Sequence, residues 1–267
     1  MKKVSVILIT ILMLIILSQG ICAKEVISVH CGAGLSPPME KIGKLFEKKY
    51  NCKVEYSFKG SGCLLGDIIF SRRGDLYIPG EMFFMKQAVK RGFIKKYKKV
   101  GFWQTVIITP RNNSKKIKTL FDLAKPGMKV GLGDEKGVAV GKASCYVLKK
   151  AGIYDKVKKN QVMACLTVNE LGVGVELGHL DAAIVWTSTA SLLGKKCRIF
   201  LIPEKYSKTT EVPMGILTFA KNPRLAEKFL EFVVTSKEAK RVFRQNGYST
   251  NIDELQKDLK RLEKNNR

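Results

Sequence analysis

Two short glycine-containing loops hold the residues of this chain whose types and spacing could do chemistry. They are residues 32–38, Gly-Ala-Gly-Leu-Ser-Pro-Pro, and residues 59–64, Lys-Gly-Ser-Gly-Cys-Leu. Each loop follows a β-type run and opens a helix-type run, so its backbone N–H groups lie where the helix dipole is positive and intrahelical partners are lacking. Glycines let the backbone approach a bound group, and Ser61 adds a hydroxyl. One such loop would be explained as a helix-capping turn, but two in one chain predict a site for a small oxyanion.

The same loops raise nucleophilic catalysis as an alternative. Ser61 or Cys63 could act as a nucleophile, with His30 or His179 as the base. No motif fixes that geometry, so we expect no enzymatic activity. No CxxC pair or zinc-type spacing is present, so we expect no metal site and no cofactor. Asp75 is a single carboxylate at the start of a strand, and we expect it to be a structural hydrogen-bond acceptor.

The N-terminus has the three parts of a secretory signal. A charged start at residues 1–3 precedes an apolar run at 4–17 and a polar stretch that ends at Ala23. The apolar run is short for a stable membrane span. We predict a signal peptide over residues 1–23 with cleavage after Ala23. A lipid anchor on Cys22 and an uncleaved tether are the alternatives. The protein is therefore expected in the periplasm or on the outer face of the cytoplasmic membrane.

The composition narrows the classes of partner. The formal net charge is +25, and removal of Lys2 and Lys3 with the signal leaves about +23. Such a field attracts nucleic acid, anionic lipid or small anions, and export disfavours nucleic acid. A protein that binds anionic lipid or polymer through its basic surface is the alternative from another class. Six cysteines follow residue 23, and either disulfides or small buried thiols would fit an exported chain.

Strand-like and helix-like patterns alternate and predict an α/β architecture. The pattern changes around residues 102–104, where we expect the chain to cross into a second lobe, and the chain returns near 200–213. Ser36 is expected to cap the helix that ends near Tyr50, and residues 235–238 have the spacing of a capping box. A chain that passes twice between two lobes allows the lobes to close around a ligand bound in the cleft between them. The predicted divisions are a first lobe over 24–101, a second lobe over 102–212, a return to the first lobe over 213–250, and a charged helical tail over 251–267.

Five segments resemble, in their order and spacing, the molybdate-binding proteins of ABC importers, which are periplasmic solute-binding proteins. The segments are residues 29–35, 58–62, 74–78, 181–186 and 243–248. The resemblance covers roughly residues 25–250 and implies a type II periplasmic-binding-protein fold, with two α/β lobes and a ligand cleft between them. It also implies capture of molybdate or tungstate and delivery to a membrane permease with its ATPase. We expect a monomer that binds no nucleic acid.

Members of that family hold the tetrahedral dianion through serine hydroxyls, backbone amides and a tyrosine hydroxyl. Carried over by position, Ser61 matches a binding serine with Gly62 beside it, and Val140 and Val168 match amide donors. Two positions depart from the family pattern. Gly34 stands where many members have serine and could offer only its amide. Trp186 stands where many have tyrosine.

At this second departure the indole N–H of Trp186, or a hydroxyl of Thr187 or Ser188, would have to replace the tyrosine. Sulfate and phosphate are the rival ligands. Phosphate is disfavoured because its proton needs an acceptor, and Asp134 and Glu135 are the carboxylates near the carried-over loops. Trp103 is expected in core or hinge packing. Glu81 is expected at the solvent or as a helix-start charge.

Overall fold

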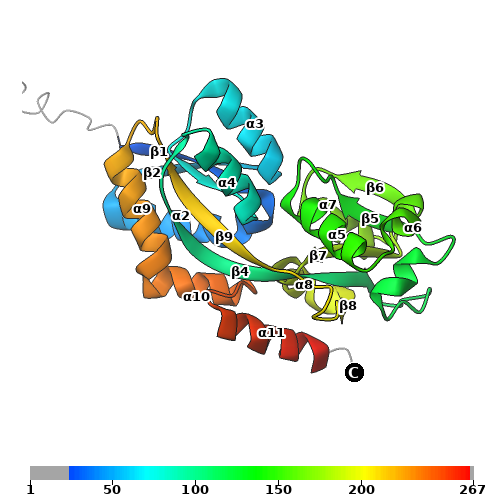
Figure 1. Cartoon of the computed structure of the whole chain (residues 1–267). Helices are drawn as coiled ribbons and strands as arrows, with labels where there is room; N and C mark the ends of the chain where they lie inside the picture. Colours follow the sequence, from blue (N-terminus) through cyan, green and yellow to red (C-terminus); the bar gives the residue numbers. More distant parts are fainter. Residues whose placement is uncertain (1–23, 265–267) are drawn as a thin grey trace, which may run out of the picture.

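The computed structural model describes residues 24–264, so the expected signal peptide at 1–23, Cys22 included, lies outside the described residues. Within them the chain is an α/β protein with two lobes, and this predicted fold class is confirmed (Figure 1). One nine-stranded sheet runs through the molecule in the order β2-β1-β3-β9-β4-β7-β5-β6, and β8 pairs with β4. The strands at the two ends of this order therefore belong to different lobes.

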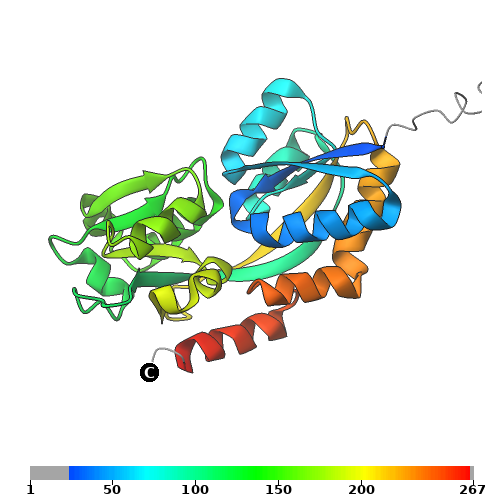
Figure 2. The same cartoon turned by 180° about the vertical axis from the view of Figure 1, so that it is seen from behind.

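The first lobe is built on three parallel strands, with helices on both faces (Figures 1 and 2). Its strands are β1 (Val26–Gly32), β2 (Lys53–Lys59) and β3 (Leu76–Ile78). Its helices are α2 (Ser36–Tyr50), α3 (Ser61–Ser71), α4 (Met82–Lys90), α9 (Pro223–Thr235) and α10 (Lys237–Gln245). The 3-10 helix η1 (Ala33–Leu35) joins β1 to α2.

The second lobe has a parallel core of β6, β5 and β7, with a separate apolar cluster beneath it. Its strands are β5 (Val130–Gly133), β6 (Gln161–Cys165), β7 (Ala182–Trp186) and β8 (Cys197–Leu201). Its helices are α5 (Ala139–Lys150), α6 (Tyr154–Lys159), α7 (Val168–Glu176) and α8 (Thr187–Leu193), with the 3-10 helices η2 (Leu120–Ala124) and η3 (Gly194–Lys196).

Two antiparallel strands, β4 (Ile94–Pro110) and β9 (Thr209–Leu217), connect the lobes (Figure 1). The sequence predicts a change of pattern at 102–104, but β4 continues through these residues as one 17-residue strand. Register shifts before Lys96 and Gly101 mark where its pairing with β9 is irregular, and such irregularities bend a strand without ending it. Both strands serve both lobes, and we propose that the lobes divide after residues 101, 212 and 250.

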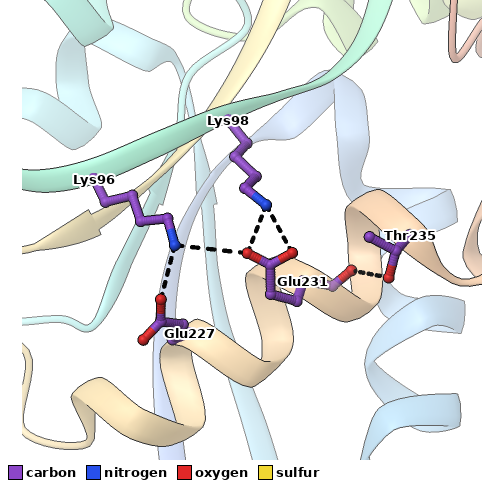
Figure 3. A network of polar contacts seen from close by, with 5 residues as sticks. All are labelled: Lys96, Lys98, Glu227, Glu231 and Thr235. Carbon is purple, nitrogen blue, oxygen red and sulfur yellow. Dashed lines mark hydrogen bonds and ion pairs between the residues drawn. The ribbon is translucent and has the colours of Figure 1, made fainter.

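An ion-pair network fastens the first half of β4 to α9 (Figure 3). Lys96 Nζ lies 2.8 Å from Glu227 Oε1, and Lys98 Nζ lies 2.6 Å from Glu231 Oε1. These side chains are partly exposed, so each pair contributes little stability by itself. Their shared effect is to hold β4 in register against the first lobe before it crosses to the second.

Two helix starts differ from the predicted caps. Ser36 is the first residue of α2, and its hydroxyl donates to Ala33 O at 3.0 Å because η1 runs directly into the helix. In α10 the cap is Ser236, whose hydroxyl accepts from Ala239 N at 3.0 Å. Thr235 donates back to Glu231 O at 2.7 Å as the last residue of α9. The predicted box was therefore one residue early.

The tail forms α11 (Ile252–Lys264), which packs on β8 and β4 through the buried side chains of Leu255 and Leu262. All six cysteines after residue 23 are free thiols, so the thiol alternative fits the structure. Burial raises the pKa of the Cys165 and Cys197 thiols to about 11, so they stay protonated. None of the helices within residues 24–264 is both long enough and apolar enough to span a bilayer.

Asp75 is a structural acceptor, as expected. Its carboxylate is 3% exposed and accepts from Ser28 N at 2.8 Å and from Asn222 N at 2.9 Å, which ties β1 to the start of α9. We predict that Asp75→Ala lowers the free energy of unfolding by roughly 2 kcal/mol, because two partly buried N–H groups lose their acceptor. Urea unfolding followed by circular dichroism measures this. Glu55→Ala, at an exposed acid paired with Lys53, is the control and should change stability far less; equal losses would contradict the assignment.

Candidate functional site

The starts of four helical segments meet at one small cavity between the lobes. The first lobe contributes the starts of η1 and α3, and the second contributes the starts of α5 and α7. The cavity has a volume of about 20 Å³, which is space for roughly one water molecule. Its lining residues are Gly32, Ala33, Gly34, Lys59, Gly60, Ser61, Gly80, Trp103, Val138, Ala139, Thr167, Val168 and Trp186. Helix starts from both lobes therefore line one cavity, and N–H groups at helix starts lack intrahelical partners.

Ser61 is the first residue of α3 and is held from two sides. Its hydroxyl oxygen accepts from Gly80 N at 2.9 Å, and its carbonyl oxygen accepts from the Tyr77 hydroxyl at 2.7 Å. Burial raises the pKa of Tyr77 well above its usual value, so that hydroxyl remains a neutral donor. A serine hydroxyl has one hydrogen to donate, and the contact with Gly80 uses only an acceptor position. The Ser61 hydrogen is thus left for a ligand.

Two tryptophans from different strands form one wall of the cavity. Trp103 of β4 and Trp186 at the end of β7 stack with ring centroids 4.8 Å apart and planes 5° apart. Trp103 Nε1 donates to Gly80 O at 2.9 Å. The indole N–H of Trp186 donates to no group among residues 24–264, so it is the tryptophan donor that a bound anion could use.

The structure brings the predicted site residues together. Gly34, Ser61, Val168 and Trp186 all line the cavity, and Val140 follows the lining residue Ala139 in the first turn of α5. Gly62 lies beside the cavity, but its N–H already donates to Gly137 O at 2.9 Å in this arrangement.

Of the other predicted donors, Thr187 is buried, and its Oγ1 accepts from Gln104 N at 3.4 Å. Ser188 is also fully buried, and neither residue lines the cavity. Among the candidates named for this position, Trp186 is thus the one that reaches the site.

Sequence reasoning missed Gly80, Thr167 and the role of Trp103. Thr167 caps α7 and precedes Val168, so the N-cap rule applied to residues 167–170 could have found it. No local sequence signal marks Gly80 and Trp103 as site residues. They reach the cavity because β4 packs against the loop that follows β3, where Trp103 bonds to Gly80. A Cβ at Gly80 would lie 2.9 Å from the Trp103 ring and 3.1 Å from Ala139 Cβ.

The lining of the cavity contains almost no charged side chains. Lys59 is the one charged residue among those lining it, and its Nζ pairs with Asp67 at 2.7 Å. No carboxylate lines the cavity. Asp134 Oδ1 accepts from Gly137 N at 2.6 Å, and Glu135 accepts from the Tyr154 hydroxyl, so both nearby acids are engaged in the loop before α5.

Glu81 corrects one expectation. It stands at the helix start of α4, as one alternative had it, but it is only 2% exposed and does not face solvent. Its Oε1 pairs with Lys208 Nζ at 2.5 Å, and Lys208 precedes β9. The carboxylate is buried because the segment after Gly80 packs against the residues before β9. A buried acid of this kind needs a cationic partner, which Lys208 supplies.

His30, one of the two bases named in the catalytic alternative, does not share a site with Ser61. His30 Nε2 lies 2.9 Å from Arg73 O, and its ring packs against Gly74, whereas Ser61 faces Gly80. Cys63 lies against the Gly137 loop. Within residues 24–264 no cluster of three or more His, Cys, Asp or Glu side chains could hold a metal ion.

The two lobes touch backbone to backbone at the rim of the cavity. A Cβ on Gly60 would lie 2.5 Å from Gly137 O and 2.6 Å from Leu166 O. Asn169 Nδ2 donates across the same rim to Ala33 O at 3.2 Å. The cleft is therefore closed in this structure, and glycine at position 60 is what permits the approach.

Comparison with known proteins agrees with this geometry. The chain is 25% identical over 225 residues to the molybdate-binding protein ModA of Mycobacterium tuberculosis, covering 84% of each chain. Its fold is similar to that of the periplasmic molybdate-binding protein of Azotobacter vinelandii, with a TM-score of 0.74, 15% identity, and coverage of 85% of this chain and 100% of the other. It is also similar to the sulfate-binding protein SubI of M. tuberculosis, with a TM-score of 0.77, 16% identity, and coverage of 89% and 91%.

These likenesses confirm the two-lobed fold of the periplasmic binding proteins, to which the sequence resemblance had pointed. The sequence profile of the bacterial extracellular solute-binding proteins matches residues 27–249, which include every residue that lines the cavity. A cavity of helix N-termini between two lobes is the arrangement expected of a protein that captures a small solute. The chain belongs to the family of bacterial extracellular solute-binding proteins.

Proposed function

We propose that this protein captures a tetrahedral oxyanion, molybdate or tungstate, outside the cytoplasm and delivers it to an ABC importer. The observation that carries the proposal is the convergence of the starts of η1, α3, α5 and α7 on one cavity without a lining carboxylate. Partial positive charges at helix starts favour a dianion, and neutral donors hold it without a counter-ion. Ser61 Oγ and Trp186 Nε1 add two side-chain donors.

The choice among oxyanions follows from the donors. Hydrogen phosphate carries a proton that needs an acceptor, and the acids Asp134 and Glu135 are engaged elsewhere. Molybdate, tungstate and sulfate need donors only. The relationship to ModA of M. tuberculosis favours molybdate, and tungstate is nearly the same size. Sulfate is the second candidate, because it also needs donors only and the fold is shared with SubI. It ranks below molybdate because the smaller ion would fit the same donors less closely.

The protein works in this proposal as an exported monomer without chemistry of its own. It is released after residue 23 or anchored at the membrane, and its partner is a permease with its ATPase. The strongly positive net charge, +25 for the full chain, raises the local concentration of anions and speeds capture, whereas the neutral cavity ranks them.

Selectivity tests the proposal directly. Calorimetric titration of the mature protein, at low and high salt, should give molybdate and tungstate much lower Kd values than sulfate and phosphate. The order should persist at high salt because it depends on fixed neutral donors. Equal Kd values for all four anions, or an order that vanishes with salt, would favour the basic-surface alternative.

Ser61→Ala tests the side-chain donor. A hydrogen bond to a charged ligand is worth roughly 1.5–3 kcal/mol, so the Kd for molybdate should rise roughly 10- to 150-fold. Thermal unfolding of the unliganded variant checks that the fold persists. Ser71→Ala, at the exposed end of the same helix, is the matched control and should bind like wild type. A folded Ser61→Ala protein with unchanged Kd would remove Ser61 from the site.

Gly60→Ala tests closure of the lobes. The backbone at Gly60 has φ −62° and ψ 146°, which alanine adopts without strain, so the added methyl acts only through its clash with Gly137 O and Leu166 O. Overpacking of this kind costs about 1–3 kcal/mol, so the Kd for molybdate should rise at least about fivefold.

Gly66→Ala is the control for Gly60→Ala, because nothing lies within 4 Å of a Cβ at that position on the same helix. Small-angle scattering with saturating molybdate should show compaction for wild type and Gly66→Ala, and less for Gly60→Ala. If the two variants bind and compact alike, closure at Gly60 is not needed for binding.

A further inference from the structure

A continuous buried layer joins the two side-chain donors of the cavity across the lobes. Trp186 stacks on Trp103 at 4.8 Å, Trp103 Nε1 donates to Gly80 O at 2.9 Å, and Gly80 N donates to Ser61 Oγ at 2.9 Å. The exposed fractions of Trp103, Trp186 and Ser61 are 1%, 2% and 2%. The layer runs from the end of β7, through β4 and the loop after β3, to the start of α3.

Each contact in the layer restricts the position or the orientation of a group that donates to the cavity. The Gly80 N–H occupies one acceptor position of Ser61 Oγ and so fixes the direction in which the hydroxyl can donate. The Trp103 N–H fixes the Gly80 carbonyl, and the Trp103 ring packs 2.9 Å from where a Gly80 Cβ would stand. The parallel face of Trp103 also fixes the plane of the Trp186 indole.

We propose that Trp103 is a positioning residue that holds Ser61 and Trp186 as oriented donors for the same oxyanion. This rests on the proposed function and deepens it. The Trp103 N–H is itself used by Gly80 O, so Trp103 acts through its neighbours rather than as a donor to the ligand. It thereby couples a donor of the first lobe to a donor of the second, and the selectivity of the site depends on it.

A double-mutant cycle tests the coupling. Trp103→Phe keeps an aromatic ring but loses the N–H, so the Kd for molybdate should rise roughly tenfold, as expected for loss of an oriented hydrogen bond. In the Ser61→Ala background the same change should raise the Kd by about threefold or less, because the oriented hydroxyl is already gone. Fully multiplicative losses would overturn the proposal.

Selectivity gives a readout that a purely structural role would not change. Trp103→Phe should narrow the ratio of the sulfate Kd to the molybdate Kd, because looser donors adapt to a smaller ion. Tyr56→Phe is the matched control, since the Tyr56 hydroxyl donates to Met39 O at 2.7 Å and neither residue lines the cavity. It should lower thermal stability and leave the ratio near the wild-type value. A ratio unchanged in Trp103→Phe would contradict the proposal.

The two indole N–H groups can be followed by NMR in the wild-type protein. The chain has two tryptophans, so a ¹⁵N spectrum shows two indole N–H signals. On titration with molybdate the Trp186 signal should shift strongly, and the Trp103 signal should stay slow to exchange with solvent. The signal that is lost in Trp186→Phe belongs to Trp186, which assigns both signals. Rapid exchange of the Trp103 N–H would overturn the positioning role while leaving the proposed function intact. Absence of binding to molybdate, tungstate, sulfate and phosphate alike would overturn both.

Discussion

The close approach of two backbones at the rim of the cavity is the constraint on which the rest of the site depends. Helix dipoles act over short distances, so the starts of α3 and α5 can serve one ion only if no side chain separates them. Gly60 and Gly62 meet this need, because a Cβ on either would lie 2.5 Å or less from a backbone oxygen of the loop before α5. The same approach leaves a cavity of about 20 Å³. An anion with four oxygens needs more room than this cavity gives. In the proposed function the liganded protein therefore stands between this closed arrangement and a more open unliganded one, and the paired strands β4 and β9 are the elements that bend.

Charge is divided between the surface and the site. The chain carries a net charge of +25, but the one cation that lines the cavity, Lys59, is paired with Asp67. A lysine left free in the site would attract any anion, and the attraction would weaken with salt. Neutral amides, a hydroxyl and an indole N–H respond instead to the position of each oxygen. In the proposed function the long-range field therefore serves encounter, and the short-range donors serve discrimination.

The sequence located the parts of the fold and site that are local, and missed those that depend on distant contacts. Both glycine loops, the helix that ends at Tyr50 and the α/β alternation could be predicted because spacing and turn chemistry act within a few residues. The change of pattern around residues 102–104 lies within β4, because the burial of its residues changes where the strand passes from one lobe to the other. The burial of Glu81 and the role of Trp103 could not be predicted, because Lys208 and Trp186 lie far along the chain from them. Thr235 and Ser236 were both acceptable caps, and the end of α9 decided between them.

The two departures from the family pattern have a common physical basis in the structure. A Cβ at Gly34 would lie 2.9 Å from Val168 Cγ1 and 3.8 Å from the Trp103 ring, so a serine there would require the opposite lobe to move away. The Trp103 ring, which would be in ordinary contact with that Cβ, is also the surface on which Trp186 stacks. A hydroxyl is thus lost on the first lobe, and an indole N–H is gained on the second. An indole N–H can only donate, whereas the serine and tyrosine hydroxyls that it and Gly34 replace can also accept. In the proposed function this exchange removes acceptors from the site and favours anions that carry no proton.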